Sequence, residues 1–332
     1  MTTVPRDLDA LLTALRAYLP YGHTITGIRQ MTYGLSNGTY ALEGAGKILR
    51  MPPEEEGLLP PYDMARQHEI YRRVGSTPGA PPVPPMLELC EDESIAGVPF
   101  YVMERLEGES FDRHNLPAWL TTDPVACGEL CRTWVEAMAS VHRMPVDTLD
   151  GPVRTSESEA AQWLTVARDL DAPAPILDVF ERFLDEPPPD SGLPTPVHGD
   201  PNITNLLWDR TRLVALLDWE LSGIGEPFAD IAFMLAFFRD EGEPASWGFE
   251  AEGWWTKPQV VRHWEAVTGR TVQKWRHHEL LAMARLATIL AIGDRLVVAG
   301  RKSDPRVGEF TSKLPRYVER IERRLLRMDV DD

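Results

Sequence analysis

The sequence is poor in cysteine, long apolar runs and positive charge, and each shortage excludes a class of protein. Its three cysteines, Cys90, Cys127 and Cys131, cannot all pair, and their spacing matches no zinc signature. No uninterrupted run of about 18 apolar residues occurs, and no charged-then-apolar signal opens the chain. We therefore expect a cytoplasmic protein with reduced thiols.

Positive charge is scarce, because 34 Lys and Arg face 51 Asp and Glu, which gives a formal net charge of −17. Non-specific binding to nucleic acid or to an anionic membrane needs clustered Lys and Arg. We expect neither as a partner, whereas a cationic or metal-chelated ligand stays compatible. The 332 residues, 43% apolar and 26% charged, suit a globular protein of one large domain or two lobes.

The first third of the chain alternates between helical and strand patterns. Residues 7–19 carry leucines at helical spacing behind a capping Asp7, and residues 64–74 fit a second helix that the proline-rich stretch 76–85 ends. Three short strands fit between residues 24 and 53, and two more fit 86–91 and 98–106. This pattern predicts a small α+β lobe with a five-stranded antiparallel sheet.

Helical periodicity dominates from about residue 116 onward and predicts a larger, mainly helical lobe. The exception is "HGDPNITNLLWDRTRLVALLDWE", residues 198–220, which follows the breaker "EPPPDSGLPTP" and contains two short strand-like runs. Helices are predicted over residues 123–144, 158–170, 176–186, 257–269, 275–300 and 315–328.

Acids and an amide border the two apolar runs of this exceptional stretch. Asp200 is followed five residues later by Asn205 and thirteen residues beyond that by Asp218, which is the spacing of the kinase catalytic loop and its metal-binding aspartate. A hairpin would bring Asn205 and Asp218 together as Mg²⁺ ligands and leave Asp200 to face an acceptor hydroxyl. His198 would hydrogen-bond nearby backbone. The alternative is that these residues only form a turn and a strand end.

With these segments, the sequence resembles the aminoglycoside phosphotransferase-like family, small-molecule kinases with a bilobal protein-kinase-like fold. The resemblance rests on "VHGDPNITNLLW", "ALLDWELSGIGEPFADIAFML", "FYVMERLEGES" and "ASVHRM". It implies an α+β fold with a nucleotide-binding lobe over residues 1–104, a catalytic and substrate-binding lobe over 105–332, and a hinge at about 103–108.

The resemblance also assigns expected roles to individual residues. Asp200 would be the catalytic aspartate, and Asn205 and Asp218 would bind Mg²⁺. Glu220 would assist the metal or hold the loop. Asp230 would brace the catalytic loop or serve as an ordinary acid at a helix start.

For the nucleotide, the resemblance implies ATP, with GTP not excluded. The backbone of the hinge would bind the adenine, and "YGLSNGTY" would cover the phosphates, although an ordinary hairpin turn also explains that stretch. The implied nucleotide-binding residues are Met103, Glu104, Leu106, Gly34, Ser36 and Asn37.

The third strand departs from the kinase pattern, because "KILRMPP" carries Arg50 where kinases carry a lysine. Lys47 lies an odd number of residues away and therefore on the opposite strand face. We expect Arg50 to bind phosphate and to pair with Glu69 of the following helix. The alternative is a surface arginine.

By resemblance, the acceptor would bind to the helical lobe, where four tryptophans are candidates for the wall of an apolar or sugar-sized site. Each has an ordinary core position as its alternative. They are Trp254, Trp255, Trp264 and Trp275.

We therefore predict an ATP- and Mg²⁺-dependent phosphotransferase that phosphorylates a hydroxyl of an aminoglycoside-like compound or another hydroxylated metabolite. The alternative is a catalytically silent nucleotide- or metabolite-binding pseudokinase. A protein kinase is disfavoured because no APE-ended activation segment follows Asp218. The expected partner is a small-molecule acceptor, and the protein is expected to be a monomer or homodimer.

Overall fold

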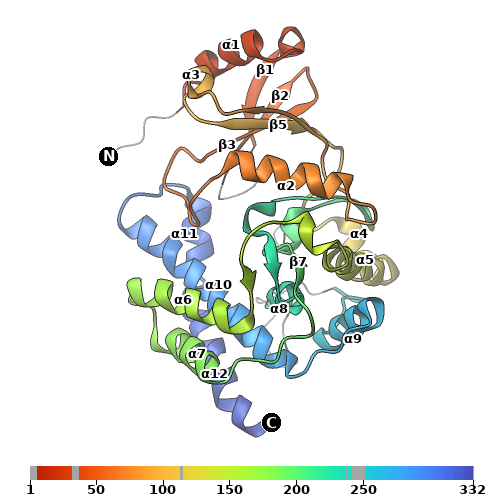
Figure 1. Ribbon diagram of the computed structural model, residues 1–332, viewed down its shortest axis with the longest axis vertical. Coiled ribbons are helices and arrows are strands. Elements are labelled where there is room, and N and C mark those ends of the chain that lie inside the picture. The colour runs from red at the N-terminus through yellow and green to blue at the C-terminus, as the bar shows by residue number, and fades with distance from the viewer. Residues whose placement is uncertain are drawn as a thin grey trace. The chain divides into compact units, whose positions relative to one another are not determined.

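The computed structural model describes residues 6–31, 37–112, 115–236, 238, 240 and 251–331. The chain divides into two compact units (Figure 1). The first unit comprises Met1–Ser76, Pro84–Leu106 and Ile292–Thr311, and the second comprises Thr77–Val83, Glu107–Ala291 and Ser312–Asp332.

The first unit is built on a five-stranded sheet in the order β1-β2-β3-β5-β4, in which all neighbouring strands are antiparallel. The predicted five-stranded antiparallel sheet is therefore confirmed. Its strands are β1 (Gly27–Gln30), β2 (Gly38–Glu43), β3 (Lys47–Met51), β4 (Met86–Cys90) and β5 (Phe100–Glu104), with the short helices η1 (Gly22–Thr24) and α3 (Glu93–Ala96) beside them.

Two helices cover opposite faces of this sheet. Helix α1 (Leu8–Tyr18) begins at Asp7, whose carboxylate caps its first turn, and its leucines pack with Leu49 and Met51 of β3. Helix α2 (Met64–Ser76) contacts the other face, where the rings of Tyr71 and Tyr101 lie 6.3 Å apart. Because side chains alternate along a strand, Arg50 lies on the face opposite to that of Leu49 and Met51.

Residues 292–311 belong to the first unit, whereas all of 105–332 was predicted to form the second lobe. The acidic segment after β3 holds them, because Glu56 pairs with Arg301 at 2.8 Å and Glu55 accepts the Ser303 N–H at 3.0 Å. Leu58 packs with residues on both sides of that contact. Helical periodicity carries no information about such long-range pairing, which explains the difference.

The second unit is mainly helical. Helical periodicity correctly predicted its long helices, but it did not isolate α8, because nearly every α8 side chain is buried and no polar face marks the helix. The helices are α4 (Ala118–Thr122), α5 (Pro124–His142), α6 (Ser156–Asp169), α7 (Ala174–Asp185), α8 (Phe228–Leu235), α9 (Lys257–Thr268), α10 (Trp275–Val298) and α12 (Leu314–Asp331); α11 (Pro305–Thr311) lies in the first unit, as do the last residues of α10.

Two small sheets bring the exceptional stretch together. Strands β8 (Leu206–Asp209) and β9 (Arg212–Leu216) form the expected antiparallel hairpin. Strand β10 (Gly223–Gly225) pairs with β7 (Thr195–Val197) and β6 (Val153–Arg154), so the chain before His198 lies beside the chain after Leu221. The short helices η2 (Val146–Thr148), η3 (Ile203–Asn205) and η4 (Trp219–Leu221) complete the connections.

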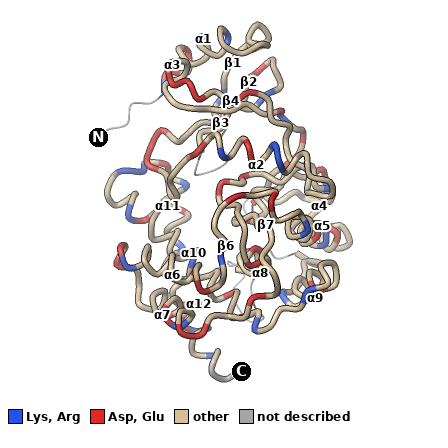
Figure 2. Tube along the Cα trace, viewed as in Figure 1, with Lys and Arg blue, Asp and Glu red and all other residues tan. Residues whose placement is uncertain are grey.

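Charges of both signs are mixed along each unit, so the acidic excess is not confined to one element (Figure 2). Within the described ranges, every helix is too short or too polar to cross a membrane.

Candidate catalytic site

The loop after β7 is held by its backbone. The N–H of His198 donates to Asp230 Oδ2 at 2.7 Å, and the N–H of Gly199 donates to Asp230 Oδ1 at 2.8 Å. Gly199 has φ 85°, and a Cβ atom there would lie 2.3 Å from the Leu221 carbonyl oxygen. Only glycine combines this backbone with this close approach. The loop that carries Asp200 is therefore fixed before any ligand binds.

The imidazole of His198 joins this loop to the segment before Asp218. Its Nδ1 accepts the Asp200 N–H at 3.2 Å, and its Nε2 donates to the Leu217 carbonyl at 2.9 Å. One ring nitrogen accepts and the other donates, which is the pattern of a neutral imidazole. The ring is fully buried and lies edge-on to Trp219 at 4.8 Å.

Asn205 is oriented by Asp200. Its Nδ2 donates to the Asp200 carbonyl at 3.0 Å and to the Asp200 carboxylate at 2.9 Å. Its backbone carbonyl accepts the Leu217 N–H at 2.7 Å, which closes the hairpin next to Asp218. Because the amide nitrogen is used, Oδ1 is the side-chain atom that can ligate a cation.

Asp218 stands where β9 gives way to η4 and adopts left-handed backbone, with φ 65°. Such backbone is costly for a non-glycine residue and is concentrated at functional sites. Burial raises the pKa of the Asp200 carboxyl, and the negative charge of Asp218 raises it further, against the opposing effects of the neighbouring His198, the Asn205 hydrogen bond and the Arg285 charge. Two carboxylates close enough to repel each other suit a site that takes up a cation.

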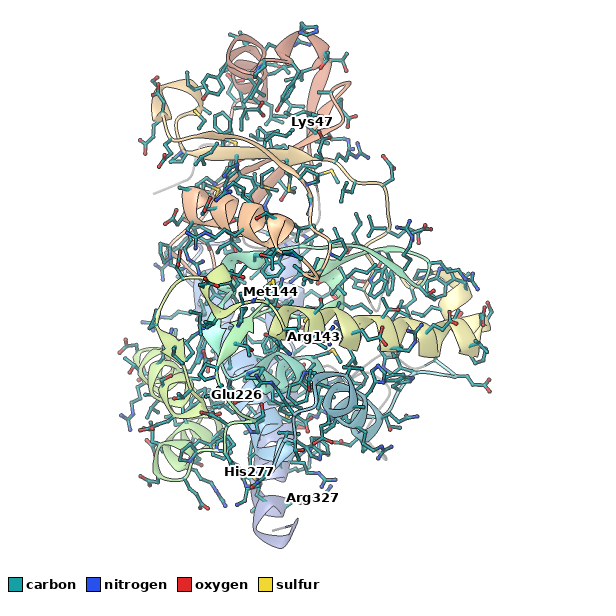
Figure 3. The ribbon with its side chains drawn as sticks, turned by 45° about the vertical axis from the view of Figure 1, so that its right-hand side comes forward. Lys47, Arg143, Met144, Glu226, His277 and Arg327 are labelled. Carbon is teal, nitrogen blue, oxygen red and sulfur yellow. The ribbon has the colours of Figure 1, made fainter. Side chains whose placement is uncertain are left out.

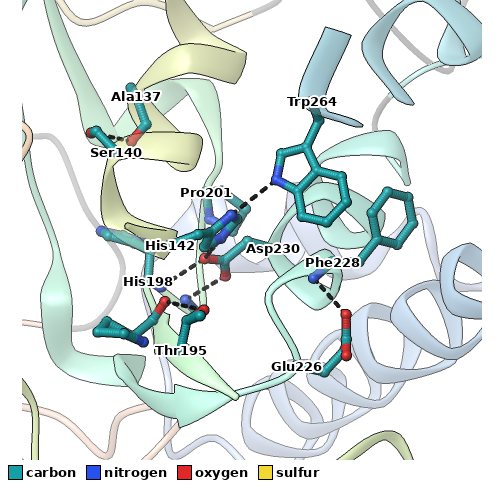
Figure 4. Close-up of polar contacts among 12 residues, drawn as sticks. Ala137, Ser140, His142, Thr195, His198, Pro201, Glu226, Phe228, Asp230 and Trp264 are labelled. Carbon is teal, nitrogen blue, oxygen red and sulfur yellow. Dashed lines mark hydrogen bonds and ion pairs between the residues drawn. The ribbon is translucent and has the colours of Figure 1, made fainter. Parts of the chain in front are cut away.

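Asp230 is the centre of a buried relay (Figure 4). His142 Nε2 lies 3.1 Å from Asp230 Oδ2, and Trp264 Nε1 donates to His142 Nδ1 at 3.0 Å. Because Nδ1 accepts a hydrogen bond from the indole, Nε2 must carry the proton, and its N–H donates a hydrogen bond to Asp230. Burial by itself would raise the pKa of Asp230, but the His142 hydrogen bond, the neighbouring imidazoles of His142 and His198 and the His198 N–H outweigh it, so that pKa lies below its ordinary value.

Two further side chains hold the same loop, and sequence reasoning missed both. Trp134 of α5 donates its Nε1–H to the Pro201 carbonyl at 3.0 Å, and Arg285 of α10 donates to the Gly199 carbonyl at 2.7 Å. Arg285 is only 7% exposed. A buried arginine inside the apolar run "LLAMARLATIL" is the sequence signal that could have marked it.

The four candidate tryptophans do not form one wall. Trp264 is fully buried and belongs to the relay, so its predicted contact with the acceptor is wrong. Trp275 begins α10 and lies ten residues, about 15 Å along the helix axis, from Arg285, which removes it from the loop as well. Trp254 packs on Trp134 at 6.3 Å, and Trp255 lies 5.1 Å from the ring of His263.

In the first unit, Arg50 lies on β3, is 9% exposed and donates to Thr39 Oγ1 on β2 at 2.8 Å. The predicted pairing of Arg50 with Glu69 is wrong, because Glu69 pairs with Arg72 and Arg73 one turn along its own helix. Gln67 faces the sheet instead and accepts from the Tyr101 hydroxyl at 3.4 Å. Residues 67 and 69 are two positions apart and therefore point to different sides of α2.

Lys47, labelled in Figure 3, lies on the opposite face of β3, as its odd spacing from Arg50 requires. Its Nζ lies 2.8 Å from the Glu104 carboxylate. In the predicted hinge, Met103 is buried in β5. The N–H groups of Glu104 and Arg105 donate to the carbonyls of Pro85 and Gly46. Leu106 is half-buried at the end of the segment.

The remaining predicted residues are only partly placed. Asn37 is buried, with its Nδ2 3.4 Å from Gln67 Oε1, whereas Gly34 and Ser36 lie outside the described residues. Glu220 is half-buried in η4, two residues after Asp218. Their roles toward nucleotide and metal stay predictions.

Comparisons with known proteins identify the family and the fold. The profile of the phosphotransferase enzyme family matches residues 27–267. Acyl-CoA dehydrogenase family member 10 of Mus musculus is 29% identical over 253 residues, which are 73% of this chain and 23% of that protein. The chain thus spans about a quarter of the length of this relative.

Solved structures show the same fold. A Ralstonia eutropha JMP134 protein, provisionally named an aminoglycoside phosphotransferase, superposes with a TM-score of 0.76 at 22% identity, covering 96% of this chain and 98% of that one. The GDP complex of aminoglycoside 2'-phosphotransferase-IIIa gives a TM-score of 0.65 at 14% identity, covering 95% and 98%. The predicted protein-kinase-like α+β fold is confirmed.

Proposed function

The chain belongs to the phosphotransferase enzyme family, and from this premise we propose that it transfers the γ-phosphoryl group of ATP to a hydroxyl of a small molecule with the help of Mg²⁺. The observation that carries the proposal is the fixed arrangement of Asp200, Asn205 and Asp218. Asn205 binds Asp200 directly, and its carbonyl closes the hairpin beside Asp218. Phosphoryl transfer depends mostly on such positioning and on charge stabilisation.

Asp200 would orient the acceptor hydroxyl and accept its proton. Burial raises the pKa of this carboxyl, which makes the carboxylate a better base than an ordinary aspartate. Its orientation is set by the Asn205 amide and by its own backbone N–H on His198. A base held in this way needs little reorganisation when the hydroxyl arrives.

The residues present fit a magnesium ion. Asn205 Oδ1 and the Asp218 carboxylate are the hard oxygen donors that Mg²⁺ prefers, and they would hold it. When bound, the ion would offset the negative charge of the phosphates. Phosphate oxygens and water would complete its coordination shell.

For the nucleotide, Arg50 supplies the positive charge on β3 that a phosphate requires, and its guanidinium is oriented by Thr39. The N–H groups of Glu104 and Arg105 are used within the unit, so the base would bind to the hinge through other backbone groups, with Leu106 as the first candidate. We propose ATP as the phosphate donor, with GTP as the competing candidate.

The acceptor we favour is a hydroxylated acyl thioester or the corresponding hydroxy acid. A relative that shares 29% identity with this chain is named acyl-CoA dehydrogenase family member 10, and the match covers only 23% of that protein, so most of the relative lies outside the matching segment. The aminoglycoside phosphotransferase structure is only 14% identical. Aminoglycosides are polycations and remain the second class, because a chain with net charge −17 suits them.

The proposal is tested by incubating the purified protein with Mg²⁺ and ATP or GTP against hydroxyacyl-CoA thioesters, hydroxy acids and aminoglycosides. Mass spectrometry detects a product that has gained one phosphate. Asp200→Ala should lower turnover by about 10²–10⁴-fold, whereas the exposed Asp209→Ala at the end of β8 should not. Normal transfer by Asp200→Ala would sink the mechanism. Nucleotide binding in a thermal-shift assay without turnover on any acceptor would favour the silent pseudokinase.

A further inference from the structure

Glu159, in the first turn of α6, pairs with two arginines from different parts of the second unit. Its Oε1 lies 3.7 Å from Arg154 NH1, and its Oε2 lies 3.9 Å from Arg285 NH1. The Nε1–H of Trp163, one turn further along α6, donates to the same Oε2 at 3.2 Å. The carboxylate is only 13% exposed, so its position is set by these three neighbours.

Each arginine uses its other terminal nitrogen to bind one of the two segments that carry the candidate site. Arg285 NH2 donates to the Gly199 carbonyl at 2.7 Å, directly before Asp200. Arg154 NH2 donates to the Leu221 carbonyl at 3.1 Å, three residues after Asp218. One carboxylate thus connects, through two guanidinium forks, the backbone that follows β7 with the backbone that follows β9.

Both arginines are themselves fixed. The Arg285 guanidinium lies over the rings of Trp163 at 5.6 Å and Phe233 at 5.0 Å, which immobilises it between α6 and α8. Arg154 belongs to β6, where its carbonyl accepts the Glu226 N–H at 3.0 Å and its backbone pairs with Gly225. Because neighbouring elements hold both arginines, the arginines can restrain the two segments and do not simply move with them.

The two bound segments also touch each other. The Gly199 Cα lies so close to the Leu221 carbonyl that a side chain on it would overlap that oxygen. A small relative shift of the two segments would change the separation of Asp200 and Asp218. The His198–Leu217 hydrogen bond and the pairing of β7 with β10 join the same two segments, and the two arginines add a further connection at Gly199 and Leu221.

We propose that Glu159, Arg154 and Arg285 form a clamp that sets the distance between the segment carrying Asp200 and the segment carrying Asp218. Glu159 is a positioning residue, because it acts through the arginines and touches neither aspartate in the contacts described above. The clamp is a property of the folded chain. Its consequence for turnover rests on the proposed function.

The first test measures the clamp without any activity, by hydrogen–deuterium exchange on the full chain. Glu159→Gln keeps the size and the acceptor for Trp163 but removes the charge that holds both arginines. Amide exchange over residues 198–200 and 219–223 should become about tenfold faster, while the β8 and β9 hairpin should not change. Arg154→Lys, a milder variant at a partly exposed residue, should accelerate exchange over 219–223 first.

The matched control is Glu181→Gln, which removes an equivalent Glu–Arg contact, at 2.7 Å to Arg168, between exposed side chains of α7 and α6. It should leave exchange in both segments unchanged. If both Glu159→Gln and Arg154→Lys exchange like the wild type in these segments, or if Glu181→Gln produces the same change, the clamp is refuted.

The second test separates positioning from stability. With a phosphorylated acceptor in hand, Glu159→Gln should lower kcat by about tenfold or more, while the KM for Mg²⁺-ATP stays within about twofold. A faster-exchanging loop with unchanged kcat overturns the catalytic role of the clamp and leaves the proposed function standing. If wild-type protein phosphorylates nothing, the proposed function fails, while the exchange result still decides whether the clamp exists.

Discussion

Replacing Asp230 with asparagine tests how the catalytic loop is held. The carboxylate accepts three hydrogen bonds, with Oδ1 serving the Gly199 N–H and Oδ2 serving both the His198 N–H and His142. An amide has a single acceptor oxygen, so Asp230→Asn can keep the hydrogen bonds of only one of the two carboxylate oxygens. Because Trp264 donates to Nδ1 of His142, the imidazole cannot switch its proton, and the asparagine carbonyl should stay at the Oδ2 position.

The hydrogen bond that Asp230→Asn loses is therefore the one from the Gly199 N–H. One charge-assisted hydrogen bond is lost, which costs about 1.5–3 kcal/mol, and the two that remain weaken by about 1 kcal/mol each because their acceptor is no longer charged. We expect Asp230→Asn to be destabilised by about 3.5–5 kcal/mol in total. Asp230→Ala, which leaves all three buried donors without an acceptor, should be less stable still.

The pH dependence follows from the lowered pKa of Asp230. A carboxyl whose pKa is lower in the folded state stabilises the fold above its unfolded value, which is about 4, and loses that effect as pH falls through the folded value. The stability difference between wild type and Asp230→Asn should thus be constant between pH 7 and pH 5. It should shrink only under more acidic conditions.

Urea unfolding at pH 7, 6 and 5 measures these differences, with the exposed Asp178→Asn of α7 as the matched control. The control should stay within about 0.5 kcal/mol of wild type. Amide exchange should then be faster at Gly199 than at His198 in Asp230→Asn. The reasoning is wrong if Asp230→Asn is as stable as the control, if its difference from wild type already falls between pH 7 and 6, or if His198 exchanges first.

Three further outcomes follow from named contacts. Gly199→Ala should lose about 1–2 kcal/mol from left-handed backbone alone, and more from the overlap with the Leu221 carbonyl, as a lower urea midpoint would show. Burial lowers the pKa of His278 from 6.5 to about 4, so the unfolded chain takes up a proton first as pH falls. Stability should drop by about 3 kcal/mol between pH 6.5 and 4, and His278→Gln should flatten that urea-midpoint profile. Trp275→Ala should leave the acceptor KM within about twofold, because Trp275 lies about 15 Å along α10 from Arg285; a large rise in KM would restore it as an acceptor contact.

The secondary structure and the central motif were predictable because both depend on local spacing. Leucines at helical intervals behind Asp7 predicted α1, and alternating apolar runs predicted the five strands and the β8 and β9 hairpin. The same is true of Asp200 and Asn205, whose separation of five residues fixes them in one short loop where the amide can reach the carboxylate. These features can be predicted without knowing which distant residues pack against them.

The direction of a side chain around its helix was harder to predict. The helix carrying Glu69 was predicted correctly, yet Glu69 turns toward Arg72 and Arg73 while Gln67 faces the sheet. Two side chains that are two residues apart point in directions about 200° apart around a helix. An error of two positions therefore assigns a residue to the wrong face of the helix.

The sequence by itself determined the fold class, the order of helices and strands, and the spacing of the three site residues. Only the tertiary structure decided that Trp264 supports His142 instead of lining a site, that residues 292–311 join the first unit, and that Glu159 joins Arg154 to Arg285. The physical reason is that periodicity and spacing record which residues are neighbours along the chain. Buried hydrogen bonds and ion pairs depend on which elements pack together, and these partners lie 5 to more than 120 residues apart.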